Sequence, residues 1–196
     1  LPRAGVGHRL DKDTSGALVV ARTLEAHHAL VKALALRDIS REYLALVFGR
    51  VIAGGTIDAP IGRHPTDRLR MAVVENGKPA VSHYRVAERF AAHSLLRVAL
   101  ETGRTHQIRV HLAHLGFPIL GDEKYGDFAL NKSLKRDGLK RMALHAWRMA
   151  FRHPLTATPV ECIAPLPDGL GNYIATVDAE KGREFTAENL ETILNR

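Results

Sequence analysis

The chain of 196 residues contains a single cysteine, Cys162, which excludes an internal disulfide framework and a cysteine-based zinc site. Because its neighbours Val160 and Ile163 are apolar, we expect Cys162 to be a buried and unreactive thiol. No apolar run approaches the ~20 residues that a transmembrane helix needs, and no signal-peptide pattern opens the chain. We therefore expect a protein of the cytoplasm that has no membrane-spanning part.

Several signatures of common enzyme classes are also absent. There are no internal repeats, no low-complexity tracts, no phosphate-binding glycine loop and no dinucleotide fingerprint. Histidine is plentiful, with 11 residues, and His106, His111 and His114 fall close together. However, no HExxH pattern occurs and no convincing carboxylate partner adjoins these histidines. We therefore expect no metal ion and no other cofactor, with a histidine-dependent metalloenzyme kept as an alternative.

Acidic residues are outnumbered by basic ones. The 21 Asp and Glu residues stand against 28 Lys and Arg residues, which gives a formal net charge of +7 and a pI of about 9.9. A basic surface favours a polyanionic partner, and nucleic acid before a membrane. Charge alone is equally compatible with a basic soluble domain that binds no nucleic acid.

The hydrophobic pattern predicts a mixture of strands and loops with few helices. We expect loops over residues 1–16 and over the charged segment 121–138. Strands are expected at 17–22, 42–48, 80–90, 94–102, 144–151 and 160–164, the last two forming an antiparallel hairpin. Strands that follow other strands indicate an α+β domain.

Two helices are predicted before residue 116. Thr23 is placed to cap a helix over residues 24–37. Thr105 opens a second helix, over residues 106–115, and Gly116 is placed to end it. The tail from Asp168 onward has room for one or two further short helices.

The segment His8–Gly16 concentrates polar and charged side chains immediately before an apolar run. Loops supported by a rigid strand are common positions for catalytic groups. Asp11 lies between Arg9 and Lys12, which favours its ionised form, and an ionised carboxylate serves as nucleophile or base. The alternative is a solvated turn in which Asp11 and Asp13 accept hydrogen bonds from local backbone amides.

The segment Gly103–His111 is the second candidate. On the predicted helix, His106 and Arg109 are three residues apart and share one face near the N-terminus. Free amides at that end favour anions, and the arginine adds a planar fork suited to a carboxylate or phosphate. The alternative is a helix whose polar face is simply hydrated.

The segment Arg41–Tyr43 opens the predicted strand over residues 42–48. Tyr43 is suited to stacking on a nucleic-acid base, because every base has a π face. The alternative is a core aromatic residue with its hydroxyl group at the rim.

Together, these segments resemble the RluA/RluD-type family of pseudouridine synthases. The resemblance covers residues 2–167 and rests on four ordered motifs: His8–Gly16; Arg41–Tyr43 and the apolar strand after it; Gly103–His111 with Pro118–Asp122 and Tyr125–Gly126; and His145–Ala146 with Phe151, His153 and Pro154. The resemblance implies a mixed, largely antiparallel sheet with flanking helices and a central catalytic cleft. It also implies that the target uracil is detached from C1′ through N1, turned, and rejoined through C5.

The resemblance also implies roles for individual residues. Asp11 falls on the essential catalytic aspartate, which either attacks the sugar or removes a sugar proton. Tyr43 falls on a tyrosine that packs on the target base and assists proton removal from C5. Arg109 falls on an arginine that pairs with the catalytic carboxylate, and Arg9 on one that enters the RNA beside the extruded nucleotide.

Further RNA contacts are expected around these residues. His8, Arg104 and His106 lie in the same motifs and are candidate RNA-binding residues. The basic segment Arg63–Arg70 is predicted to grip RNA through its arginines, Arg63, Arg68 and Arg70.

Within the family, the chain is most similar to the D-type subgroup, which acts on large-subunit (23S) ribosomal RNA. The segments Pro2–Gly5, Ile61–Met71 and Gly77–Ala80 carry this similarity. Full-length members have an S4-like RNA-binding domain and further core strands before the aspartate motif, which begins here at His8. We therefore expect residues 1–196 to be one monomeric catalytic domain, incomplete at its N-terminus and without the S4-like domain. The alternative is a non-catalytic RNA-binding or ribosome-assembly module that uses the same basic cleft.

Overall fold

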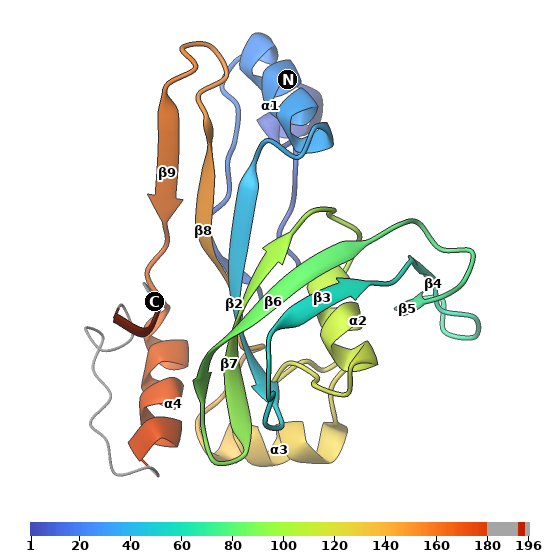
Figure 1. Ribbon diagram of the computed structural model, residues 1–196, viewed down its shortest axis with the longest axis vertical. Coiled ribbons are helices and arrows are strands. Elements are labelled where there is room, and N and C mark those ends of the chain that lie inside the picture. Colours follow the sequence, from blue (N-terminus) through green and yellow to red (C-terminus); the bar gives the residue numbers. More distant parts are fainter. Residues whose placement is uncertain (180–191, 195–196) are drawn as a thin grey trace.

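The computed structural model describes residues 1–179 and 192–194. Its α-helices are Leu24–Ala35 (α1), Gln107–His114 (α2), Phe128–Arg136 (α3) and Asp168–Ala179 (α4), after a 3-10 turn at Pro2–Gly5. Its strands are Ser15–Gly16 (β1), Ser40–Phe48 (β2), Gly55–Asp58 (β3), Ile61–Arg63 (β4), Met71–Val73 (β5), Val81–Arg89 (β6), His93–Leu100 (β7), Leu144–Arg152 (β8) and Pro159–Ile163 (β9). Figure 1 shows these elements around one extended sheet.

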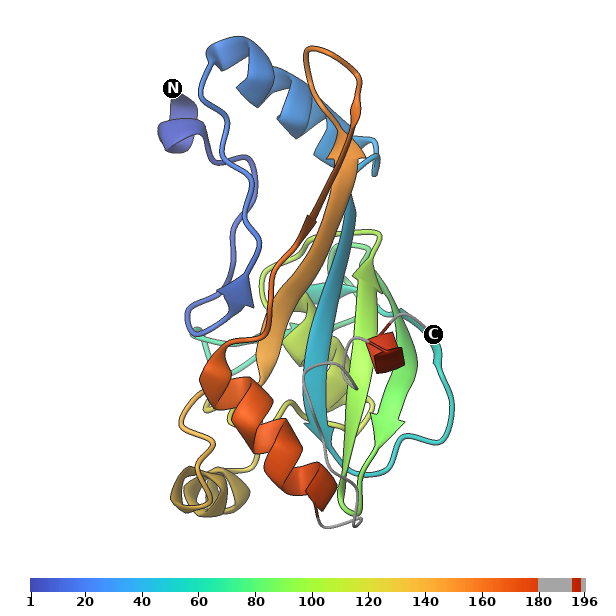
Figure 2. The same ribbon diagram turned by 90° about the vertical axis from the view of Figure 1, so that its left-hand side faces the viewer.

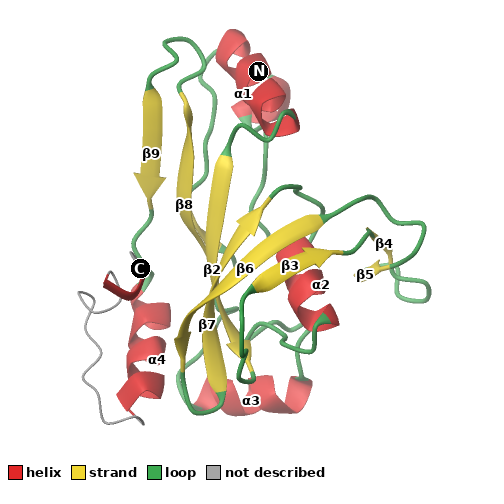
Figure 3. Cartoon of the chain, viewed as in Figure 1, coloured by secondary structure: helices red, strands yellow, loops and turns green. Residues whose placement is uncertain are grey.

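The main sheet is mixed and mostly antiparallel. Its strand order is β1-β8-β2-β7-β6-β3, and β9 also pairs with β8. Only the β1–β8 pair is parallel among the strand pairs of the described residues. Helices flank the sheet, as the red and yellow elements of Figure 3 show. The predicted α+β class with a largely antiparallel sheet is therefore confirmed.

Strand β2 is the centre of the sheet. It pairs with β7 along one side and with β8 along the other, both antiparallel. The run from Tyr43 to Val47 is buried throughout, as expected for a strand whose two faces are both covered. The prediction of a central strand over residues 42–48 is confirmed.

Helices from the middle and from the C-terminal part of the chain contribute to one hydrophobic core. Ile108 and Leu112 of α2 and Leu170 and Ile174 of α4 belong to the same buried cluster as the apolar residues of β2. In Figure 1, α2 lies behind β6 and β3. No helix within the described ranges is long and apolar enough to cross a membrane.

Strands β4 and β5 form a separate hairpin that projects from the main sheet (Figure 1). Ile61 at its base packs with Ala80 and with Val110 of α2 in a small buried cluster. The basic segment between these strands is therefore held beside the N-terminal half of α2.

The predicted strand over residues 17–22 is wrong. The structure has a two-residue strand, Ser15–Gly16, just before it and an isolated bridge between Val6 and Val20 within it. Leu18 and Val20 are exposed, so this apolar run lies along the outside of the sheet and not within it. Figure 2 shows this N-terminal segment running beside β8.

Gly16 fixes the close approach of this segment to β8. Its φ is +118°, and a Cβ atom there would lie 2.1 Å from the Ala146 carbonyl oxygen. A side chain at this position is therefore excluded both by backbone conformation and by space. The polar loop that precedes Gly16 is held against the sheet as a result.

The predicted loop over residues 121–138 contains a helix, α3. Asp127 caps it, since its side chain accepts a hydrogen bond from the Leu130 amide. Leu134 of the same helix is buried in the main core. The prediction of a loop was wrong because the charged residues of α3 are exposed and belong to the polar face of a short amphipathic helix.

The other predictions have mixed outcomes. The helix capped by Thr23, the strand pair 80–90 and 94–102, and the hairpin of β8 and β9 are confirmed. The prediction of a buried thiol is wrong, because Cys162 is exposed on β9. The expected helix after Asp168 is α4, and the rest of the tail prediction, apart from 192–194, lies outside the described residues.

Candidate active site

A cavity of about 610 Å³ opens between the N-terminal loop, β2 and the start of α2. It brings together seven of the predicted site residues: His8, Arg9, Asp11, Tyr43, Arg104, His106 and Arg109. They come from three motifs that are far apart in the sequence. The sheet and the packing of α2 against it create this convergence.

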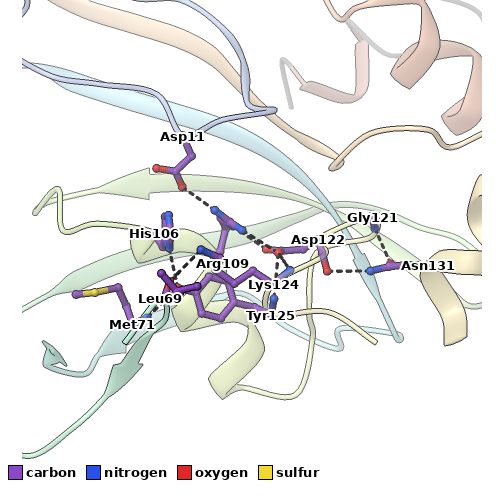
Figure 4. Close-up of polar contacts among 10 residues, drawn as sticks. All are labelled: Asp11, Leu69, Met71, His106, Arg109, Gly121, Asp122, Lys124, Tyr125 and Asn131. Atoms are coloured by element: carbon purple, nitrogen blue, oxygen red, sulfur yellow. Dashed lines mark hydrogen bonds and ion pairs between the residues drawn. The ribbon is translucent and has the colours of Figure 1, made fainter. Parts of the chain in front are cut away.

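Asp11 and Arg109 face each other across the cavity (Figure 4). The Arg109 Nη1 atom lies 3.4 Å from the Asp11 Oδ2 atom, which is long for a charge-assisted hydrogen bond. The side chains are 9% and 17% exposed. Among the described residues, Arg109 is the ion-pair partner of Asp11, and this one contact leaves carboxylate oxygen available to a ligand.

Arg109 is held much more tightly by Asp122. Its Nε donates to Asp122 Oδ2 at 2.7 Å and its Nη2 donates to Oδ1 at 2.9 Å, in a bidentate pair. Burial acts to lower the pKa of Arg109, but the hydrogen bonds and charge of Asp122, with a contribution from Asp11, raise it overall. The guanidinium is thus a fixed positive charge at physiological pH.

Asp122 is itself fixed by the backbone. Its Oδ1 accepts from the amides of Lys124 and Tyr125, and its carbonyl oxygen accepts from the Asn131 side chain. Burial acts to raise the pKa of Asp122, but Arg109 and these amides lower it overall. Sequence reasoning gave Asp122 no role, although the segment Pro118–Asp122 carried part of the resemblance.

His106 precedes α2 in a left-handed conformation, with φ of 57°, and Thr105 is not the cap. The expected position of His106 within the helix is therefore wrong by one residue. Its Nδ1 atom lies 2.6 Å from the Tyr125 hydroxyl, which accepts from the Met71 amide. Burial lowers the pKa of His106, so a neutral ring that accepts from the tyrosine hydroxyl fits this arrangement.

Tyr125 is a second residue that sequence reasoning did not assign. Its ring lies under two guanidinium groups, with the Cζ atoms of Arg109 and Arg70 at 5.0 and 5.3 Å from the centroid. The tyrosine thereby links the site to the β4–β5 hairpin. Its partners come from distant segments, so no local pattern indicates them.

Tyr43 is buried on β2 and 8% exposed. Burial raises the pKa of its hydroxyl, the charge of Asp11 adds to this, and Arg41 opposes it. The side chain therefore stays a neutral phenol at physiological pH. The interpretation of Tyr43 as a core aromatic with its edge at the site agrees with this burial, and the residue also lines the cavity.

The loop that carries Asp11 is anchored beyond it. Ser15 Oγ lies 2.7 Å from His145 Nδ1, and His145 Nε2 lies 2.9 Å from the Ala164 carbonyl oxygen. Arg141 Nη2 donates to Ser15 Oγ and to the Asp13 carbonyl oxygen. These contacts fix the C-terminal side of the turn that follows Asp11.

A second cavity, of about 770 Å³, adjoins the first and shares Arg9, His106 and Arg109 with it. Arg70 lines it, together with Lys12, Lys124, Lys135, Lys140 and Arg141. Arg63 and Arg68 line neither cavity; they are exposed on the β4–β5 hairpin, where Arg63 donates to the Arg68 carbonyl oxygen. The predicted RNA-binding segment is therefore divided between a cavity wall and an outer surface.

Among the described residues, no group of three or more His, Cys, Asp and Glu side chains is placed to hold a metal ion. His111 is fully buried, and its two ring nitrogens contact Ser82 Oγ and the Ala59 carbonyl oxygen. His106 is engaged by Tyr125. Two of the three histidines that suggested a metal thus have other partners.

Known proteins with similar sequences share one activity in their names. The family model "RNA pseudouridylate synthase" matches residues 2–114. The "Ribosomal large subunit pseudouridine synthase D" of Xanthomonas campestris pv. campestris is 52% identical over 190 residues, which cover 93% of this chain and 57% of that protein. The protein of the same name from Escherichia coli (strain K12) is 47% identical over 189 residues, covering 92% and 57%. The chain thus spans less than two thirds of the length of these relatives.

Solved structures agree with the sequence comparison. The structure of "Human RNA Pseudouridylate Synthase Domain Containing 1" superposes with a TM-score of 0.71 and 33% identity, covering 86% of this chain and 72% of that one. "Human RNA Pseudouridylate Synthase Domain Containing 4" gives a TM-score of 0.69 and 27% identity, covering 86% and 74%. The fold and the sequence together show that this chain belongs to the RNA pseudouridylate synthase family.

Proposed function

We propose that the protein isomerises specific uridines of large-subunit (23S) ribosomal RNA to pseudouridine, with Asp11 as the essential carboxylate. One observation carries this proposal. The carboxylate of Asp11 and the guanidinium of Arg109 meet at 3.4 Å inside a cavity that Tyr43 also lines. The names of the bacterial relatives supply the class of RNA.

The reaction requires little beyond these groups. It breaks the C1′–N1 bond, turns the uracil and forms a C1′–C5 bond, with no net oxidation and no cofactor. Asp11 acts either as a nucleophile at the sugar or as the base that removes a sugar proton. In both cases Arg109 orients the carboxylate, because Asp122 fixes the guanidinium from the other side.

The target nucleotide has to leave its stack to reach Asp11, at a cost of a few kcal/mol. The aromatic ring of Tyr43 offers a surface for the uracil, which offsets part of that cost. Because its pKa is raised, Tyr43 contributes a neutral hydroxyl and an apolar ring and not a phenolate. Arg9 lines both cavities and is placed to contact RNA on either side of the extruded nucleotide.

The β4–β5 hairpin is proposed to grip the RNA backbone through its exposed arginines. Replacing Arg63 and Arg68 by glutamate is expected to weaken RNA binding and to make the slope of log K against log salt shallower by about 2, one unit for each lost phosphate contact. The measurement is a salt titration of RNA affinity. The matched control is Arg152→Glu, an exposed residue at the far end of β8. An unchanged affinity and slope would remove the hairpin from the RNA interface.

We also propose that the protein acts as a monomer in the cytoplasm and that residues 1–196 form one catalytic domain. The main sheet supports the second point, because it includes strands from three of the four motifs (β1, β2 and β8), and α2 of the remaining motif packs in the same core. Sedimentation with and without RNA measures the first.

The direct test is incubation of the protein with large-subunit ribosomal RNA, followed by pseudouridine mapping through base-specific chemical tagging. Product at a small number of discrete uridines is the expected result. Tight RNA binding without any product would instead favour the non-catalytic RNA-binding module.

A further inference from the structure

Arg41 lines the same cavity as Asp11 and Arg109 but, unlike Arg109, has no carboxylate partner among the described residues. Its Nε atom is buried and has no hydrogen-bond partner, and the described residues provide no ion pair for its guanidinium. Burial lowers the pKa of Arg41, which reflects the cost of desolvating an uncompensated charge. Nothing in the function proposed above uses this residue.

Three other buried or half-buried arginines near β2 have carboxylate partners. Arg109 has Asp122 and Asp11, and Arg97 and Arg148 share Glu42, which follows Arg41 in β2. Asp11 is the one carboxylate among the described residues that line the cavity, against the cations of Arg3, Arg9, Arg41, Arg104 and Arg109. Since Asp11 is already paired, the cavity has an excess of positive charge around Arg41.

His8 adds a hydrogen-bond donor to the same wall. Its Nε2 atom accepts from the Val19 amide, so the ring proton of the neutral imidazole lies on Nδ1. Burial lowers the pKa of His8, and the charge of Arg41 lowers it further. The neutral ring therefore offers one N–H group and leaves the charge of Arg41 as the attraction for an anion.

The position of the guanidinium is restricted by Gly103. A Cβ atom at Gly103 would lie 2.9 Å from the Arg41 Nη1 atom. The loop that leads into α2 thus passes directly against the arginine, and only a residue without a side chain leaves it undisturbed. The guanidinium therefore lies close to this backbone, and the described residues give it no counter-ion.

We propose that Arg41 and His8 form a binding site for the RNA phosphate adjacent to the target uridine, a proposal that rests on the isomerase function above. A phosphodiester supplies the missing negative charge, and its two free oxygens match the arginine fork. Tyr43 lines the same cavity as Arg41 and Asp11, and the charges of both act on the pKa of its hydroxyl. The phosphate, the base and the sugar of one nucleotide would then be bound by Arg41, Tyr43 and Asp11 respectively.

The test uses a large-subunit ribosomal RNA fragment in which the wild-type protein forms pseudouridine. Two further versions carry a neutral methylphosphonate in place of the phosphate on the 5′ or the 3′ side of that uridine. Wild-type affinity is expected to fall roughly tenfold to a hundredfold for one of the two. Arg41→Gln is expected to bind the native RNA more weakly than the wild type by a similar factor. The methylphosphonate should then reduce the affinity of this variant almost no further.

The controls separate the possible failures. Arg50→Gln, at an exposed position beyond the end of β2, should respond to the methylphosphonate as the wild type does. His8→Gln retains an acceptor for Val19 and should show a smaller loss than Arg41→Gln. If Arg41→Gln does not fold, Arg41→Lys is used: it keeps the charge without the fork, and should bind more weakly than the wild type while still discriminating against the modified RNA.

Two results would overturn the phosphate site. One is a wild-type protein whose affinity is insensitive to both methylphosphonates. The other is a folded Arg41→Gln variant whose affinity still falls by the full wild-type factor when the RNA carries the methylphosphonate, so that the two losses of affinity multiply. Absence of pseudouridine with native RNA and wild-type protein is a different outcome, because it contradicts the isomerase function itself.

Discussion

Asp11→Asn is expected to reduce pseudouridine formation by at least ~10³-fold, while the affinity for RNA stays within about twofold of wild type. Asparagine has the size of aspartate but no carboxylate to attack the sugar or remove a proton. The fold should tolerate the change, because Arg109 keeps its bidentate pair with Asp122. Single-turnover rates and a filter-binding titration on the same RNA measure the two quantities.

Asp13→Asn is the matched control in the same loop. Asp13 has a φ of 69°, a conformation that asparagine adopts as readily as aspartate. Its contact with Arg141 is made by the backbone carbonyl oxygen and survives the substitution. This variant should therefore retain wild-type turnover. Retained turnover in Asp11→Asn would show that another group carries the reaction.

Much of the fold was predictable because its centre is apolar on both faces. The run from Tyr43 to Val47 contains no polar residue, and such a strand has to be covered on two sides. The hairpin of β8 and β9 is likewise marked by a Pro- and Thr-rich turn between apolar segments. These signals are local, so one sequence suffices to find them.

The failures share a different cause. The run Ala17–Arg22 is apolar, but whether an apolar segment forms a strand depends on a pairing partner that periodicity does not report. Here the pairing with β8 falls on Ser15 and Gly16 instead. In α3, the cap Asp127 and the buried Leu134 were present in the sequence, but the surrounding lysines outweighed them. Local composition was given more weight than helix-end chemistry.

The residues that line the candidate site were easier to predict from the sequence than the residues that hold them in position. Asp11 and Arg109 are separated by 98 positions, and only the family resemblance connected them before the structure did. Asp122 and Tyr125 were missed because their partners, Arg109 and His106, come from another segment. A buried carboxylate that binds an arginine looks in sequence like any other loop aspartate.

Asp122→Asn is expected to lower the free energy of unfolding by about 3 kcal/mol and the turnover number by about 100-fold. The pair is buried, and Asp122 is only 1% exposed. The neutral amide of asparagine cannot compensate the charge that Arg109 keeps in this buried position. The guanidinium then loses the contact that fixes it, and Asp11 loses its orientation. Because this role is one of positioning, the turnover number should change far more than KM.

The pH dependence of stability distinguishes this pair from other causes of instability. The pKa of Asp122 is lowered from an ordinary value of 3.8 in the folded state. Its contribution is therefore complete well above pH 3.8 and is lost as the pH falls through the lower, folded-state pKa. The difference in melting temperature between wild type and Asp122→Asn should be largest near pH 7 and shrink below pH 4.

Asp127→Asn provides the matched substitution five residues away. Asp127 caps α3 through its side chain, and asparagine is an equally good cap, so both melting temperature and turnover should stay near wild type. If Asp122→Asn behaves in the same way, with its melting difference absent at pH 7, then the bidentate pair does not hold Arg109. The orientation of Asp11 would in that case have to come from the contacts of its loop with His145 and Arg141.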